Sequence, residues 1–141
     1  QFGVGAWTRL EDIRFGPEVT TLRGEPVDFT IHVSLAYAGE LQLELIQPVA
    51  GQTIHAEFLE AHGPGLHHVC FAVDDVDAAC AAAEEAGTPV LMRGSMMDGE
   101  IEFVYVDASA AGAPYVELAR IGPAMQAFYD DIRRTSAAQG G

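Results

Sequence analysis

Residues Gly63–Asp77 read G-P-G-L-H-H-V-C-F-A-V-D-D-V-D, a strand pattern that is followed at once by the start of a helix pattern. The alternating apolar residues of Leu66–Val73 predict a short strand that begins with the paired histidines His67 and His68. Asp75 follows as a favourable N-cap for an alanine-rich helix. A histidine at the start of a strand, on rigid backbone, is well placed to act as a ligand. If the strand is regular, His67 faces the opposite side and has a structural role.

The rest of the chain alternates between strand and helix patterns. The expected elements, in order, are strands at Ala6–Phe15, Val27–Tyr37 and Leu41–Ile46, a helix at Gln52–His62, the strand at Leu66–Val73, a helix at Val76–Ala86, strands at Val90–Met92, Glu100–Asp107 and Pro114–Arg120, and a last helix after Gly122. Turn formers occupy Gly16–Gly24, Pro48–Gly51 and Gly94–Gly99. In the last helix, Met125, Phe128 and Ile132 form an apolar stripe that we expect to cover the core.

Two neighbouring strands each carry a polar face. In Val27–Tyr37 the polar side includes Asp28 and His32, and in Leu41–Ile46 Glu44 lies opposite the leucines. The simplest interpretation is a sheet face exposed to solvent. The functional alternative is that Asp28 and His32 line a cavity near Glu44 and contact a substrate there.

The order of elements contains a partial repeat. The second half runs strand, helix and three strands, whereas the first half has three strands and lacks the opening strand and helix. Glu44 and Glu117 then occupy equivalent final strands. We expect one domain over residues 1–141, with a partial first module at 1–50, a linker helix at 51–63, a second module at 64–121, and a C-terminal helix and tail at 122–141.

Composition limits the partners. The chain has 141 residues and a net charge of −14, with 21 acids against 7 basic residues, all of them arginine. A nucleic-acid partner is excluded because the chain has too little positive charge to displace counterions, and an anionic membrane surface is disfavoured for the same reason. The acidity also disfavours the phosphates of a coenzyme A ester. Cys70 and Cys80 have no redox or metal spacing, so we expect both to be buried and reduced, and the protein to be cytoplasmic.

Three motifs together resemble a known family. They are L-Q-L-E-L-I-Q-P at Leu41–Pro48, G-L-H-H-V-C-F-A-V-D-D at Gly65–Asp75, and Y-V-E-L at Tyr115–Leu118. In this order they are similar to the vicinal-oxygen-chelate superfamily, and within it to the glyoxalase I and methylmalonyl-CoA epimerase branch.

The resemblance implies an α+β fold of paired βαβββ modules that form a half-open barrel around one divalent metal ion, with a C-terminal helix added. By this resemblance Glu44, His68 and Glu117 are metal ligands, and a fourth ligand belongs to the opening strand that the first module lacks. Carboxylates with one imidazole suit Mg, Mn, Co, Ni or Zn.

The chemistry that follows is isomerase or lyase chemistry next to a carbonyl group, of the epimerase or glyoxalase type. The ion would stabilise an enediolate, and Glu117 would act as the base on a small carbonyl substrate. Tyr115 shares the strand face of Glu117 and is a candidate substrate contact. The alternatives are a binding protein of the antibiotic-resistance type, without catalysis, and an extradiol-type dioxygenase. Without the resemblance, His68 and Glu44 would be interpreted as ordinary strand residues.

Unpaired strand edges in a half-open barrel need cover. We therefore expect a homodimer that buries such an edge or the C-terminal stripe.

Overall fold

The computed structural model describes residues 4, 6–109 and 114–140. The strands are β1 (Thr8–Phe15), β2 (Thr20–Leu22), β3 (Glu25–Pro26), β4 (Phe29–Ala38), β5 (Leu41–Gly51), β6 (His68–Ala72), β7 (Val90–Met96), β8 (Ile101–Asp107) and β9 (Tyr115–Ile121). The helices are α1 (Ile54–His62), α2 (Val76–Glu85) and α3 (Pro123–Gly140).

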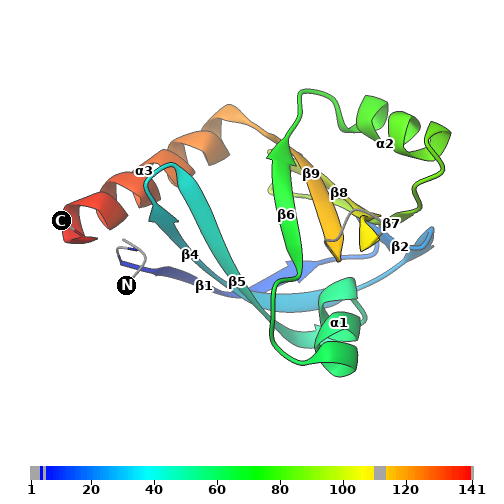
Figure 1. Ribbon diagram of the computed structural model, residues 1–141, viewed down its shortest axis with the longest axis horizontal. Helices are drawn as coiled ribbons and strands as arrows, with labels where there is room; N and C mark the ends of the chain where they lie inside the picture. The colour runs from blue at the N-terminus through cyan, green and yellow to red at the C-terminus, as the bar shows by residue number, and fades with distance from the viewer. Residues whose placement is uncertain (1–3, 5, 110–113, 141) are drawn as a thin grey trace.

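The strands form two sheets that lie side by side (Figure 1). One sheet has the order β1-β4-β5 and the other has the order β3-β2-β7-β8-β9-β6. In both sheets the last antiparallel pair (β4 with β5, β8 with β9) carries one of the two glutamates, and β6 joins β9 in parallel. This confirms an α+β fold of two related, open modules.

Most of the core lies between the sheets. Phe29 and Leu35 on β4 are buried and belong to one apolar cluster with Met92 and Phe103 of the second sheet. Phe15 stacks on Phe29 with ring centroids 4.8 Å apart. Burial of this alternating apolar face is what holds the two sheets together.

Helix α2 covers the outer face of the second sheet, where Val76 and Cys80 pack with Val104 and Val106. Cys80 is therefore buried, as predicted. The prediction was wrong for Cys70, which is exposed because it lies on an edge strand; both thiols are free.

Three segments predicted as turns contain strand. Gly94 lies inside β7. Phe103 and Thr20 approach the backbone there so closely that a Cβ atom on residue 94 would lie 2.8 Å from each, which explains the glycine. Strand β5 continues through Pro48 to Gly51, with a register shift at Thr30. The Gly16–Gly24 region forms β2, which pairs with β7 of the second sheet.

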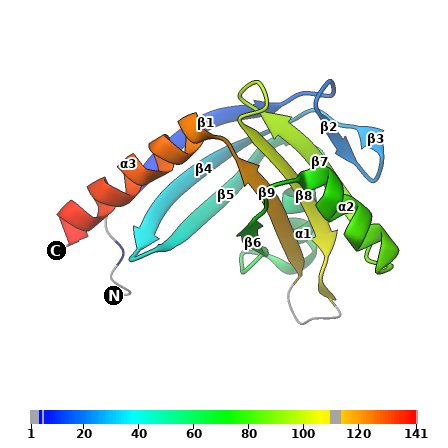
Figure 2. The same cartoon turned by 90° about the horizontal axis from the view of Figure 1, so that it is seen from above.

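The helix caps and faces partly match the prediction. Asp75 caps α2, since its side chain accepts a hydrogen bond of 3.0 Å from the backbone N–H of Ala78. Helix α3 runs along the first sheet (Figure 2) and buries Met125 and Ile132. The prediction for Phe128 was wrong, because that side chain is 37% exposed.

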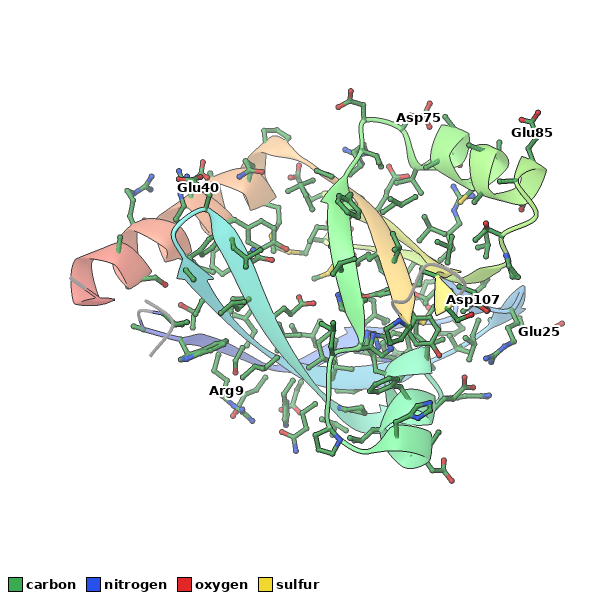
Figure 3. All side chains as sticks on the ribbon, viewed as in Figure 1. Arg9, Glu25, Glu40, Asp75, Glu85 and Asp107 are labelled. Carbon is green, nitrogen blue, oxygen red and sulfur yellow. The ribbon has the colours of Figure 1, made fainter. Side chains whose placement is uncertain are left out.

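The acidic excess lies at the periphery of the molecule. The labelled side chains of Glu25 and Glu85 project outward from the fold (Figure 3). Within the described residues, no helix has both the length and the apolar character needed to cross a membrane.

Candidate metal and proton-transfer site

Three of the predicted site residues converge on one point. Glu44 comes from β5, His68 from β6 and Glu117 from β9. The Nε2 atom of His68 lies 3.5 Å from a carboxylate oxygen of Glu44 and 3.5 Å from one of Glu117. Two sheets therefore contribute to one cluster of two carboxylates and an imidazole.

Strand register determines which way these side chains point. Glu44 pairs across the ladder with Leu35, and paired residues in an antiparallel ladder share a face, so the carboxylate lies on the buried face of the first sheet. In the second sheet Glu117 pairs with Tyr105 on β8, and His68 lies on the same face two residues before the strand partner of Glu117.

The carboxylates change the acidity of His68. Burial alone would lower the pKa of this imidazole, but hydrogen bonds and charges from Glu117 and Glu44 outweigh it and raise the pKa to about 9. The His68 side chain is only 10% exposed. Without a metal ion, the His68 ring is therefore protonated at neutral pH.

The ring of Tyr105 packs against this cluster. Its ring meets that of His68 edge-on, with centroids 5.1 Å apart. Burial, together with the charges of Glu117 and Glu44, raises the pKa of the Tyr105 hydroxyl well above its usual value. The hydroxyl therefore stays protonated. The sequence alone did not point to Tyr105, because its role depends on the register of β8 with β9.

The prediction for the orientation of His67 was wrong. Its Nδ1 atom lies 3.0 Å from Nδ1 of His68, and its ring packs on Tyr115 with centroids 4.6 Å apart. The regular strand begins only at His68, so alternation does not determine the direction of His67. Burial, with the charge of His68 added, lowers the pKa of His67 to about 4, so this ring is neutral.

His55 is a neighbour that the sequence analysis missed. It lies in the first turn of α1, is buried, and packs against the tilted ring of His67 with centroids 4.6 Å apart. The available signal in the sequence was a histidine directly after the apolar Ile54 near the start of the predicted helix.

The structure does not bring Asp28 and His32 to the cluster. His32 lies on the face of β4 opposite Leu35, whereas Glu44 shares the face of Leu35. Asp28 pairs with Arg14, whose Nε donates a hydrogen bond of 2.9 Å to it, on that outer side. The polar faces of β4 and β5 therefore lie on opposite sides of the sheet, and these two residues are not at this site.

Tyr115 lies beside the cluster. It pairs with His68 across the β6–β9 ladder, and its ring contacts that of His67. Its place at the margin is compatible with a substrate contact.

Comparison with known proteins now supplies the family. Residues 2–106 match the family model described as the glyoxalase/bleomycin resistance protein/dioxygenase superfamily. The chain belongs to this superfamily. The resemblance drawn from the three motifs is confirmed.

Individual relatives within the superfamily are epimerases. The chain is 35% identical over 80 residues to an ethylmalonyl-CoA/methylmalonyl-CoA epimerase from Cereibacter sphaeroides, a match that covers 56% of this chain and 59% of that protein. The chain thus spans about three fifths of the length of that relative.

Solved structures of the superfamily share the fold. The methylmalonyl-CoA epimerase from Mycobacterium tuberculosis aligns with a TM-score of 0.54 and 23% identity, covering 69% of this chain and 67% of that chain. A Streptomyces coelicolor methylmalonyl-CoA epimerase variant in complex with 2-nitronate-propionyl-CoA aligns with a TM-score of 0.55 and 20% identity, covering 66% and 69%.

Proposed function

We propose that this chain is a metal-dependent enzyme of the epimerase type that removes and returns a proton on a carbon next to a carbonyl group. The observation that carries the proposal is the pair of carboxylates, Glu44 and Glu117, each 3.5 Å from Nε2 of His68. The match to an epimerase over 80 residues supports the same reaction class.

The residues present suit a divalent ion. Ligand atoms about 2.0–2.6 Å from a common ion lie roughly 3–3.5 Å from one another. The separations between His68 and the two carboxylates, 3.5 Å each, need little adjustment to reach that geometry. Two oxygens and one nitrogen suit Mg, Mn, Co, Ni or Zn. A bound ion would polarise the substrate carbonyl and stabilise the negative charge of the enediolate.

A side chain of the protein would accept the proton from the substrate carbon and return it. Glu117 has a side chain only 15% exposed and lies against His68, so we assign it as the base that accepts the proton from carbon. Tyr105 stays protonated beneath it. Tyr115 at the margin is the proposed substrate contact. Glu44, His68 and Glu117 would hold the ion in place.

Charge limits the substrate class. Every arginine of the chain is in an ion pair; the pairs are Arg9–Glu11, Arg14–Asp28, Arg23–Glu57, Arg93–Asp77, Arg120–Glu102, Arg133–Glu40 and Arg134–Asp131. Positive charge for the phosphates of coenzyme A is therefore scarce. We propose that recognition rests on the acyl group, a 2-substituted malonyl thioester or a similar dicarbonyl compound, whose two oxygens can chelate one ion.

Hydrogen–deuterium exchange tests the proposal. The Mn²⁺- or Co²⁺-loaded chain is mixed in D₂O with 2-methylmalonyl thioesters of coenzyme A and of N-acetylcysteamine, and loss of the C2–H signal is followed by NMR. We expect exchange with both thioesters, and a rate at least about 100-fold lower for Glu117→Gln.

Glu85→Gln, a change at an outward-facing carboxylate on α2, is the matched control and should exchange like the wild type. Absence of exchange with every ion tested would contradict the proposal. Ligand binding without exchange would favour the binding-protein alternative.

A further inference from the structure

Three histidines form a second group of potential ligands. His55 comes from α1, and His67 and His68 come from the start of β6. One nitrogen from each ring lies within 4.8 Å of the others. The two Nδ1 atoms of His67 and His68 are within hydrogen-bond distance at 3.0 Å, and this separation is also close to the spacing of about 3 Å between neighbouring nitrogen ligands of one ion.

Two nitrogens of this group have no partner. The Nε2 atoms of His55 and His67 are buried without a hydrogen bond to any residue in the described part of the chain. His55 is 6% exposed. A buried polar atom without a partner costs about 1–3 kcal/mol. Two such atoms in adjacent rings, whose centroids are 4.6 Å apart, indicate that a ligand belongs there.

In His68 and His55, the other ring nitrogen contacts an oxygen of a neighbouring side chain. His68 directs Nε2 toward Glu44 and Glu117, and His55 places Nδ1 2.9 Å from the hydroxyl of Thr53. Metal-binding histidines commonly donate their second N–H to a carboxylate or another oxygen, which fixes the tautomer and makes the ligating nitrogen more basic. This arrangement leaves Nε2 of His55 without a partner in the described part of the chain, and it turns Nδ1 of His68 toward His67 and away from the carboxylates.

We propose that His55, His67 and His68 form a transition-metal site distinct from the carboxylate cluster, with His68 common to both. Three imidazoles favour Zn²⁺, Cu²⁺ or Co²⁺ over Mg²⁺ and Mn²⁺, which prefer oxygen. In this second site Glu44 and Glu117 act as hydrogen-bond acceptors for His68. The inference does not depend on the proposed reaction.

Cu²⁺ electron paramagnetic resonance on the unmodified chain gives a direct test. We expect superhyperfine splitting from at least two histidine nitrogens. Splitting from one nitrogen or none would overturn the proposal, and this measurement requires no variant to fold.

Variants then separate the two sites. By calorimetry, His55→Gln and His67→Gln should each weaken Zn²⁺ binding about 10- to 100-fold. His55→Gln should leave Mn²⁺ binding within about twofold, because Nδ1 of His55 contacts Thr53. Glu117→Gln should weaken Mn²⁺ binding and keep the nitrogen-rich Cu²⁺ spectrum. His62→Gln, at an exposed histidine of α1, is the matched control.

Circular dichroism verifies that each variant folds. If His55→Gln does not fold, the Zn²⁺ affinity of His67→Gln alone tests the proposal. Wild-type Zn²⁺ affinity in His67→Gln would overturn the proposal and show that the rings serve only in packing. Mn²⁺ binding and proton exchange at Glu44 and Glu117 would remain unaffected, so the two proposals can fail separately.

Discussion

A carboxylate oxygen of Glu44 lies 3.5 Å from the Nε2 atom of His68, although the two residues belong to different sheets. The contact joins the last strand of the first module to the first strand of the second. Glu117 completes the cluster from the neighbouring strand, β9.

The first prediction concerns Glu44. In Glu44→Gln an anionic ligand is replaced by a weaker neutral one, so Mn²⁺ affinity should fall about 10- to 100-fold. Isothermal titration calorimetry measures the change. Glu85→Gln, on the far side of the second sheet, should bind like the wild type, and equal affinity in Glu44→Gln would remove this residue from the proposed ligand set.

The second prediction concerns pH. The pKa of His68 is raised to about 9 in the folded, metal-free protein, against burial, by Glu117 and Glu44, whereas an unperturbed imidazole titrates near 6.5. Between pH 6.5 and pH 9, His68 therefore keeps in the folded state a proton that it has lost in the unfolded state. The resulting stability is fully present below pH 6.5 and is lost as pH rises through 9, so the free energy of unfolding should fall by about 2–3 kcal/mol over this range.

Urea unfolding in the presence of a chelator measures this effect. His68→Gln is the control, because the difference between the two proteins removes the titration of cysteine and tyrosine that both share. Parallel pH profiles for wild type and His68→Gln would show that the ion pairs with Glu44 and Glu117 add no stability.

The third prediction concerns Gly51, which ends β5 at φ +85. A Cβ atom there would collide with the carbonyl oxygen of Asp28 and lie 2.7 Å from Cα of Phe29. Gly51→Ala should therefore lower the free energy of unfolding by about 2–4 kcal/mol. In Gly39→Ala (φ +64) the new Cβ has nothing within 4 Å in the described part of the chain, and the expected cost is about 1 kcal/mol. Equal losses, measured by urea unfolding, would contradict the steric argument.

The fourth prediction concerns assembly. Met125 and Ile132 of the α3 stripe are already buried within the protomer. Leu41 and Leu45 on β5, by contrast, are 64% and 60% exposed. Strand β5 also has an unpaired edge within the described residues. We expect a homodimer that covers β5, and Leu45→Asp should shift it to monomer in light scattering at micromolar concentration.

Leu59→Asp is the matched control for assembly, since Leu59 is a 42% exposed leucine on α1. It should leave the dimer intact. A wild-type monomer at that concentration would refute the prediction.

Local sequence patterns predicted most of the secondary structure and its faces. Alternation placed Glu44 opposite the leucines of β5, and Asp75 identified the start of α2, because side-chain direction in a strand and capping at a helix end depend on neighbours along the chain. The same logic was wrong for His67, which precedes the first residue of the regular strand.

The motifs, through their family resemblance, pointed to Glu44, His68 and Glu117. Only the packing of the two sheets showed that these side chains meet, that Asp28 and His32 lie on the other face, and that His55 joins the group from α1. Periodicity determines which way a side chain leaves its own strand, but not the register between strands or the approach of one sheet to another. Those depend on burial of the shared core by residues far apart in the sequence, and they decided the composition of the site.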